Sequence, residues 1–162
     1  MTFAEQVAKF AQRTERRLAK TVSGAATKLA SNIVMATPID LPEGMHDPGS
    51  VGRARGGWVA GFDTNLTSND TPLDPVGGAT VQKIAQAFAL YAPRTQTTLY
   101  LVNTVGYIRK LEFGGYNFPD ENRVKTLPTG FSIQAPQGMV RVNAKAWPSL
   151  VSNAARVSRT VR

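Results

Sequence analysis

Residues 3–34 read FAEQVAKFAQRTERRLAKTVSGAATKLASNIV, and this stretch decides the fold. Its apolar side chains recur at steps of three or four residues or near multiples of them, and no proline interrupts it. They are Phe3, Val7, Phe10, Leu18, Val22, Ala25, Leu29 and Ile33. The pattern predicts a single amphipathic helix over about residues 3–35. At 1.5 Å per residue its length is ~48 Å, more than a small domain needs, so part of it is expected to touch a neighbour.

The polar face of this helix is basic. It carries Lys9, Arg13, Arg16, Arg17, Lys20 and Lys28. The formal charge is +4 over residues 1–36, −2 over 37–102 and +6 over 103–162, within a total of +8, and Arg156, Arg159 and Arg162 lie in the last stretch. A field of this sign favours a polyanion or an acidic protein face and also aids solubility. The basic face is therefore either solvated or a binding surface.

Shorter elements are predicted in the middle of the chain. Pro38 ends the first helix, because the residue before proline favours extended backbone, and residues 38–57 read as a loop. A strand is predicted over 58–62, and a surface loop follows to residue 75. The next elements are a helix over 81–89 that follows Gly77 and Gly78 and is stopped by Pro93, a strand over 97–102, and a short helix near 107–111 closed by a left-handed Gly114.

The last third of the chain combines an irregular segment with a helix. Residues 113–131 hold several aromatic side chains, which predicts that this segment packs on its own domain or reaches a neighbouring subunit. Pro136 is expected in the first turn of a C-terminal helix, whose buried face includes Trp147. Pro148 should kink or split that helix, and the end beyond Asn153 should fray. The fold class is α+β: a small antiparallel sheet packed with a long N-terminal, a central and a C-terminal helix.

Composition excludes several kinds of chemistry. The 162 residues predict one domain over 1–162, without cysteine and with His46 as the lone histidine, so thiolate sites and sites that need two histidines are excluded. Phosphate-binding loop and serine-nucleophile motifs are absent. The oxygen and nitrogen ligands among residues 40–47 lie in a proline-broken loop and are not read as a metal site. On these grounds no enzyme activity, cofactor or metal is expected. No membrane partner is expected either, since no apolar run approaches the roughly 18 residues of a membrane span.

Three separated segments do not read as generic core. They are TPID at 37–40 with GRARGGW at 52–58, the run from Asn103 to YIRKLEFG at 107–114, and QAPQGMV at 134–140. In order and content they resemble the tail-component family of long-tailed bacteriophages, which includes the minor tail protein Z type, also called tail completion or neck proteins. The resemblance covers nearly the whole chain. Residues 41–51 and 115–133 depart from it, because they are longer than the corresponding family segments and look like inserted loops.

The resemblance implies a structural virion protein. Such a protein is a subunit of a ring, often a hexamer, at the head-proximal end of the tail, and it surrounds the channel through which the genome passes. The implied partners are further copies of the chain, a tail terminator or tail tube protein and the head–tail connector, with non-specific contact with passing DNA as an addition. The implied location is the virion, after assembly in the host cytoplasm.

Candidate structural and interface residues follow from these motifs. Trp58 is expected to anchor the first strand in the core, with an interface role as the alternative. Asp40 and Arg53 either form an ion pair or stay solvated. Glu112 is expected to cap or pair locally near Arg109, or else to bond a neighbouring subunit. The remaining candidates are Tyr107, Tyr116, Phe118, Gln134, Pro136 and Met139. The alternative function is a basic protein that binds nucleic acid without sequence preference, through phosphates.

Overall fold

The computed structural model describes residues 1–39, 50–62, 66–67, 72–95, 98–114, 132 and 134–160 of the chain. Helix α1 (Phe3–Ala36) is the long amphipathic helix predicted from the sequence. Thr2 and Glu5 form a reciprocal capping box at its start. At its end Thr37 adopts an extended conformation before Pro38, as expected for a residue that precedes proline. The fold class expected from the sequence is confirmed.

The sheet of the described residues has two antiparallel strands, β1 (Trp58–Gly61) and β2 (Tyr100–Asn103). Trp58 lies opposite Asn103, and the register runs to Gly61 opposite Tyr100. Helix α3 (Gly78–Ala89) packs on β1 and on α1. It ends at Ala89 with a cap at Leu90, so Pro93 lies beyond its end and does not stop it directly.

Two short helices flank the sheet. Helix α2 (Arg53–Gly56) lies in a segment predicted to be loop, and this prediction was wrong because four residues are too few to show a helical period. Helix α4 (Ile108–Phe113) is the predicted short helix. Gly114 ends it with a φ of 77°, but its ψ of −160° lies outside the left-handed helical region that was expected.

The C-terminal helix is split, as the position of Pro148 predicted. Helix α5 (Val140–Ala144) is separated from α6 (Trp147–Thr160), whose first turn contains Pro148 and needs no intrahelical donor there. Two details were wrong. Pro136 lies in an exposed turn before α5 and not in its first turn, and α6 continues to Thr160 because the buried Ser158 anchors it to α1.

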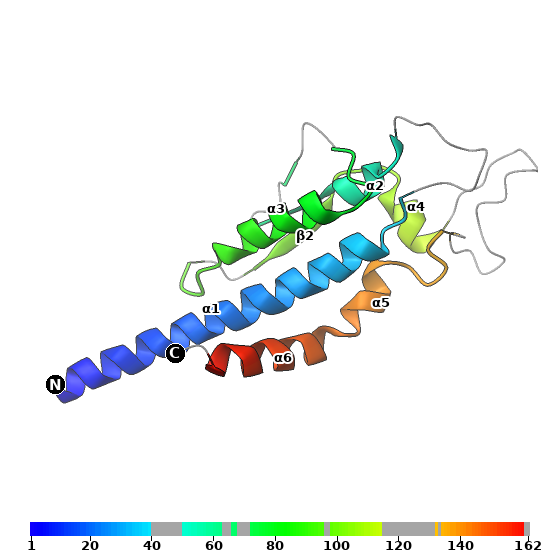
Figure 1. The fold of residues 1–162 in the computed structure, drawn as a ribbon. Coiled ribbons are helices and arrows are strands. Elements are labelled where there is room, and N and C mark those ends of the chain that lie inside the picture. The colour runs from blue at the N-terminus through cyan, green and yellow to red at the C-terminus, as the bar shows by residue number, and fades with distance from the viewer. Residues whose placement is uncertain are drawn as a thin grey trace, which may run out of the picture.

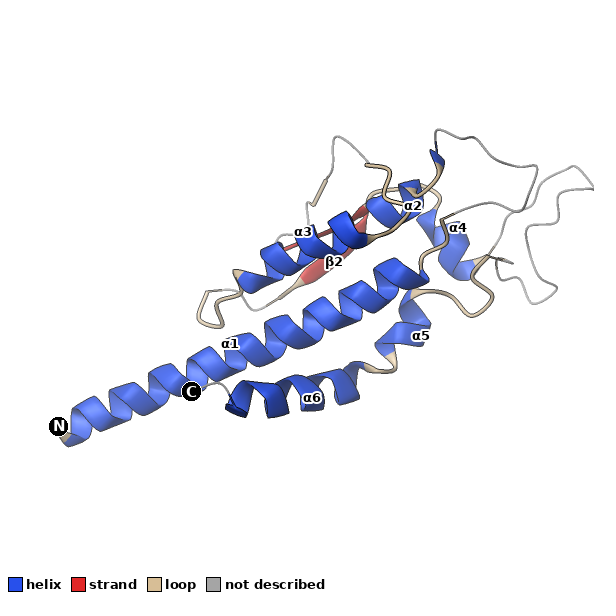
Figure 2. Cartoon of the chain, in the orientation of Figure 1, coloured by secondary structure: helices blue, strands red, loops and turns tan. Residues whose placement is uncertain are grey.

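Helix α1 runs between two layers: α5 and α6 lie on one side, and α3 with the sheet lies on the other (Figures 1 and 2). The main core forms where these layers meet α1. It consists of Ala26, Ala30, Ile33, Val34, Trp58, Ile84 and Phe88. All of the α1 residues in this core belong to its C-terminal third, so the N-terminal part of the helix does not contribute to it.

Candidate interaction surfaces

The N-terminal part of α1 extends beyond the other elements (Figure 1). Every residue from Phe3 to Thr14 is exposed, and we call residues 3–14 the overhang. Phe3, Val7 and Phe10 lie on one side of it at helical spacing and are 81%, 49% and 71% exposed. The overhang therefore displays an apolar stripe that the described part of its own chain does not cover.

A basic stripe runs along a different side of the same helix. Lys9, Arg13, Arg16 and Lys20 follow one another at helical spacing and are exposed, as is Arg17. At 3.6 residues per turn, the middle of this row lies about 120° around the helix from the middle of the apolar stripe. The overhang thus separates its apolar and charged faces.

Helix α6 brings further basic side chains alongside α1. Its Ser158 hydroxyl lies 3.0 Å from the hydroxyl of Thr21, and Ala154 packs opposite Gly24. Arg156 and Arg159 are exposed, and Arg156 donates a hydrogen bond of 2.9 Å to Asn153. The two basic ends of the sequence therefore lie on neighbouring helices.

The charge of the described surface is strongly one-sided. The described residues include 16 Lys and Arg against four acids. Asp74 and Glu112 are buried, Glu15 is 2.8 Å from Arg94, and Glu5 accepts a hydrogen bond from the backbone of Thr2. Each of these four carboxylates already has a partner inside the chain, so the outward field of the described part of the molecule is positive.

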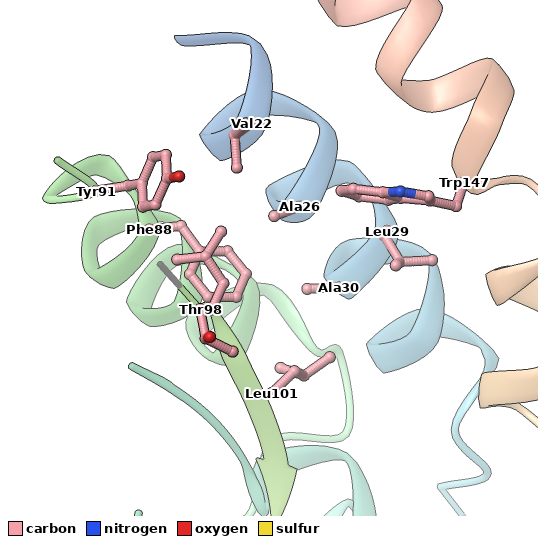
Figure 3. Close-up of a pocket in the computed structure, with 10 residues that line it drawn as sticks. Val22, Ala26, Leu29, Ala30, Phe88, Tyr91, Thr98, Leu101 and Trp147 are labelled. Carbon is pink, nitrogen blue, oxygen red and sulfur yellow. The ribbon is translucent and has the colours of Figure 1, made fainter. Parts of the chain in front are cut away.

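An apolar pocket opens beside the middle of α1 (Figure 3). Its volume is about 320 Å³. Its walls consist of uncharged residues. They come from α1, from α3 and the turn after it, from β2 and the residues just before it, and from the start of α6. They are Val22, Ala26, Leu29, Ala30, Phe88, Tyr91, Thr98, Leu99, Leu101 and Trp147. Trp147 is 38% exposed at the rim, which corrects its expected place on the buried face of the last helix.

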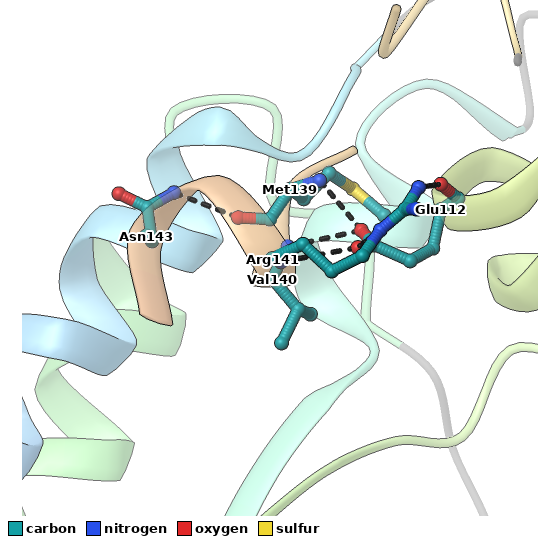
Figure 4. A network of polar contacts seen from close by, with 5 residues as sticks. All are labelled: Glu112, Met139, Val140, Arg141 and Asn143. Atoms are coloured by element: carbon teal, nitrogen blue, oxygen red, sulfur yellow. Dashed lines mark hydrogen bonds and ion pairs between the residues drawn. The ribbon is translucent and has the colours of Figure 1, made fainter. Parts of the chain in front are cut away.

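Glu112 fastens α4 to the start of α5 (Figure 4). Its carboxylate accepts backbone N–H bonds from Met139, Val140 and Arg141 at 2.5, 2.9 and 3.1 Å, and a guanidinium bond from Arg141 at 3.1 Å. Burial raises the pKa of Glu112, but the four hydrogen bonds together outweigh it and lower that pKa. The expected pairing with Arg109 was wrong, because the carboxylate points to a segment 27 to 29 residues further along the chain.

Gly138 permits this approach. Its φ is +78°, and a Cβ there would lie 2.6 Å from a carboxylate oxygen of Glu112. Glycine is therefore required by the backbone angle and by the space that the carboxylate occupies. Met139, next in the chain, is fully buried.

A second polar network ties the end of α1 to α2 and α3. Thr37 donates to the carbonyl of Ile33 and accepts from the indole of Trp58, both at 2.8 Å, which confirms Trp58 as a core residue. The Arg55 guanidinium donates to the carbonyls of Thr37, Met35 and Pro75. It fixes the C-terminal end of α1 against the segment that leads into α3.

Asp74 holds the start of α3. Its carboxylate accepts from the N–H of Gly77 at 2.7 Å and from the N–H and hydroxyl of Thr80 at 2.8 and 2.7 Å. Burial acts to raise the pKa of Asp74, but these hydrogen bonds and the charge of Arg55 lower it overall. Neither Asp74 nor Arg55 was predicted from the sequence, although an aspartate shortly before a helix is a typical capping signal.

The remaining candidate residues from the sequence lie outside these polar networks or outside the described residues. Asp40, Tyr116 and Phe118 lie outside the described residues, as do nearly all residues of the two segments that look like inserted loops. Arg53 is exposed on α2 near Tyr107, whose pKa is raised by burial and lowered by the Arg53 charge, with a net upward shift. Gln134 is half-buried in the turn before α5.

The three segments that carry the resemblance meet in space. Ala54, Leu111, Ala135 and Met139 form one buried cluster, with a member from each segment. The Asn103 side chain donates to the carbonyl of Ala54 at 2.8 Å, which links β2 to α2. Residues that are up to 85 positions apart in the chain thus build one structural unit beside the end of α1.

Comparisons with protein-family models, curated proteins and solved structures find no match for this chain. Within the described ranges no helix has the length and apolarity needed to cross a membrane. The same residues contain no group of three His, Asp or Glu side chains placed to hold a metal ion.

Proposed function

We propose that this chain is a structural virion protein of a long-tailed phage: a ring-forming tail completion or neck subunit at the head-proximal end of the tail. In this role it joins tail to head and surrounds the DNA channel. The observation that carries the proposal is the overhang, whose apolar stripe is exposed in the single chain. A helix that extends past its own core is useful when another subunit covers it.

The contact among the three segments that carry the resemblance also supports this proposal. The segments that resemble the phage family are brought into contact by the cluster of Ala54, Leu111 and Met139 and by the bonds of Glu112. A ring of identical subunits requires two different patches that meet around the circle. The chain offers apolar surface at two separate places, the overhang and the pocket.

The positive surface fits the channel and the neighbours that the proposal implies. Basic side chains on α1 and α6 would meet passing DNA or acidic faces of the tail terminator, tail tube or head–tail connector proteins. The proposal places the chain in the virion, after assembly in the host cytoplasm.

Light scattering and negative-stain microscopy of the purified protein, together with mass spectrometry of purified virions, test this function. We expect rings in solution, or a monomer that is found in virions because it assembles only on the tail. A strict monomer that is also absent from virions contradicts the proposal.

A second candidate function is binding of nucleic acid without sequence preference, and the ratio of 16 basic to four acidic described residues favours it. Contacts of this kind are made to phosphates and weaken steeply with salt. A titration with duplex DNA at about 50 and 200 mM salt should show a loss of affinity of orders of magnitude if six or more phosphates are contacted. No binding at the lower salt concentration removes this candidate.

A further inference from the structure

We infer that the basic stripe of α1, together with Arg17 beside it, binds the phosphate backbone of duplex DNA. We call these five side chains the cation row: Lys9, Arg13, Arg16, Arg17 and Lys20. The inference rests on the proposed function, because it names the surface with which a subunit around the DNA channel meets the duplex. It assigns this contact to one side of α1 and leaves out the arginines of α6.

The cation row lies on one side of the helix and is uniform in charge. At 3.6 residues per turn its members fall within about 100° of the circumference and extend about 17 Å along the axis. Every residue of 9–20 that falls within this sector is Lys or Arg, and all five are exposed. The sector therefore presents five positive charges to solvent with no apolar or acidic side chain between them.

The two acids of α1 leave most of the row uncompensated. Glu15 lies about 140° around the helix from the middle of the row and is 2.8 Å from Arg94. Glu5 precedes Lys9, the first member of the row, by one turn, and its carboxylate accepts a hydrogen bond of 2.8 Å from the backbone of Thr2. No other member of the row is three or four residues from an acid in this helix, which is the spacing at which side chains pair.

Neighbouring cations of the row are close enough to repel each other. Arg13 is three residues from Arg16 and four from Arg17, and these two are four and three residues from Lys20. Like charges at these spacings destabilise a helix. Phosphates placed against this side remove the repulsion, so charge complementarity favours a partner with several closely spaced negative charges.

Duplex DNA has the charge density that the row matches. It carries one phosphate per ~3.4 Å of each strand, which gives about five phosphates over the ~17 Å of the row. Lys and Arg are among the side chains that supply the phosphate contacts of DNA-binding proteins. A protein partner would require a different composition, because the centre of a protein–protein interface is apolar and depleted of charge.

The position of α6 disfavours a lipid surface as the partner. A helix that lies on a bilayer buries its apolar face, which here is the stripe of Phe3, Val7 and Phe10. Thr21 follows Phe3 by about five turns, so it lies on the same side of α1, and its hydroxyl is 3.0 Å from that of Ser158 on α6. A flat surface laid along the stripe therefore meets α6, which runs beside α1 (Figure 1).

The arginines of α6 are not part of the row. Ser158 faces α1, and Arg156 and Arg159 lie about 160° and 100° around α6 from it, so both point away from α1. Arg156 also donates a hydrogen bond of 2.9 Å to Asn153. These two exposed arginines give a matched control, because their removal changes the net charge without changing the row.

The row is tested with labelled duplex DNA of about 20 base pairs, titrated by fluorescence anisotropy from about 50 to 200 mM salt. Arg13→Gln with Arg16→Gln removes two charges from the row, and Arg156→Gln with Arg159→Gln removes two from α6. For the unmodified chain we expect log affinity to fall with log salt at a slope of up to about −4.5 per bound subunit. The row pair should make this slope shallower by about 1.8 and weaken binding by about tenfold or more at the lowest salt. The α6 pair should change the affinity by less than about twofold.

Several outcomes overturn the inference. Equal losses from the two pairs would show that binding follows the net charge and not the row, and the same conclusion holds if the unmodified chain binds no duplex at the lowest salt. Two probes identify other partners. Phosphatidylglycerol vesicles that bind the chain more tightly than duplex DNA and are released by Phe10→Ser would assign the surface to a membrane, and tighter binding of polyglutamate would assign it to an acidic protein.

These outcomes are separable from failure of the proposed function. Rings or virions that contain the chain, with duplex binding unaffected by the row pair, reject the row but leave the function standing. A strict monomer that is absent from virions rejects the function, even where the row pair weakens duplex binding.

Discussion

At the scale of single residues, Glu112 is a buried position that requires a side chain able to accept several hydrogen bonds. Its carboxylate accepts three backbone N–H bonds and one guanidinium bond while it is 5% exposed. Glu112→Gln keeps the size but replaces one accepting oxygen with a donor that faces N–H groups. We expect a loss of about 1–3 kcal/mol in the free energy of unfolding, measured by urea denaturation. Arg109→Gln on the same helix is the control and should have little effect, because Arg109 is exposed. Equal losses from both would show that Glu112 pairs locally.

The two buried carboxylates also predict how stability depends on pH. The pKa values of Glu112 and Asp74 are lowered in the folded chain. Their stabilising contribution is therefore complete above the unfolded values, about 4, and is lost as the pH falls toward the folded values. Urea midpoints should fall as the pH decreases from about 5 to 3. The variant Glu112→Gln with Asp74→Asn should show a flatter slope over this interval, and an unchanged slope would contradict the assignment.

These residues also show what a sequence can and cannot predict at this scale. Trp58 was predicted in the core because a tryptophan at the start of a strand brings a large apolar side chain that can anchor the strand there. The partners of Glu112 were not predicted. Its basic neighbours in the sequence are Lys110 and Arg109, whereas in the structure its carboxylate binds Arg141 and the N-terminus of α5. Local spacing predicts local pairs, and a tertiary hydrogen bond across 27 residues leaves no periodic signal.

At the scale of elements, α1 divides into two parts. The overhang is a helix held by its own hydrogen bonds and the capping box of Thr2 and Glu5, whereas the part from Ala25 onward is packed on both sides. Isolated helical turns open readily. In the monomer, hydrogen exchange should be much faster for amides of residues 6–14 than for those of 28–36. Thr2→Ala should speed exchange only near the N-terminus, and equal protection along α1 would contradict this division.

The elements were predicted as far as their periodicity extends. Helices α1 and α3 show the helical spacing over several turns, and Pro148 marks the break between α5 and α6. Helix α2 was missed because its four residues span one turn, and Pro136 was misplaced because a proline suits a turn as well as a first helical turn. The exposed end of α1 could not be told from the buried one, since both carry the same stripe.

At the scale of the whole molecule, charge separates the two candidate functions. The described residues carry 16 basic and four acidic groups, so neighbouring copies of this part of the chain repel each other. Salt screens that repulsion, with a Debye length of about 10 Å at 0.1 M. An interface between copies that uses the apolar stripe should therefore strengthen with added salt, whereas phosphate contacts should weaken.

This difference in sign gives the last prediction. From about 50 to 200 mM salt, the protein concentration at half-assembly should fall in sedimentation or light scattering, while the DNA affinity should drop by orders of magnitude if many phosphates are contacted. Glutamate at Arg13, Arg16, Arg17 and Lys20 should weaken the salt dependence of both, because it lowers the net charge of the described residues from +12 to +4 and removes part of the phosphate contacts. Assembly that weakens with salt in the unmodified chain would show that its interface is ionic, and would contradict an interface through the apolar stripe.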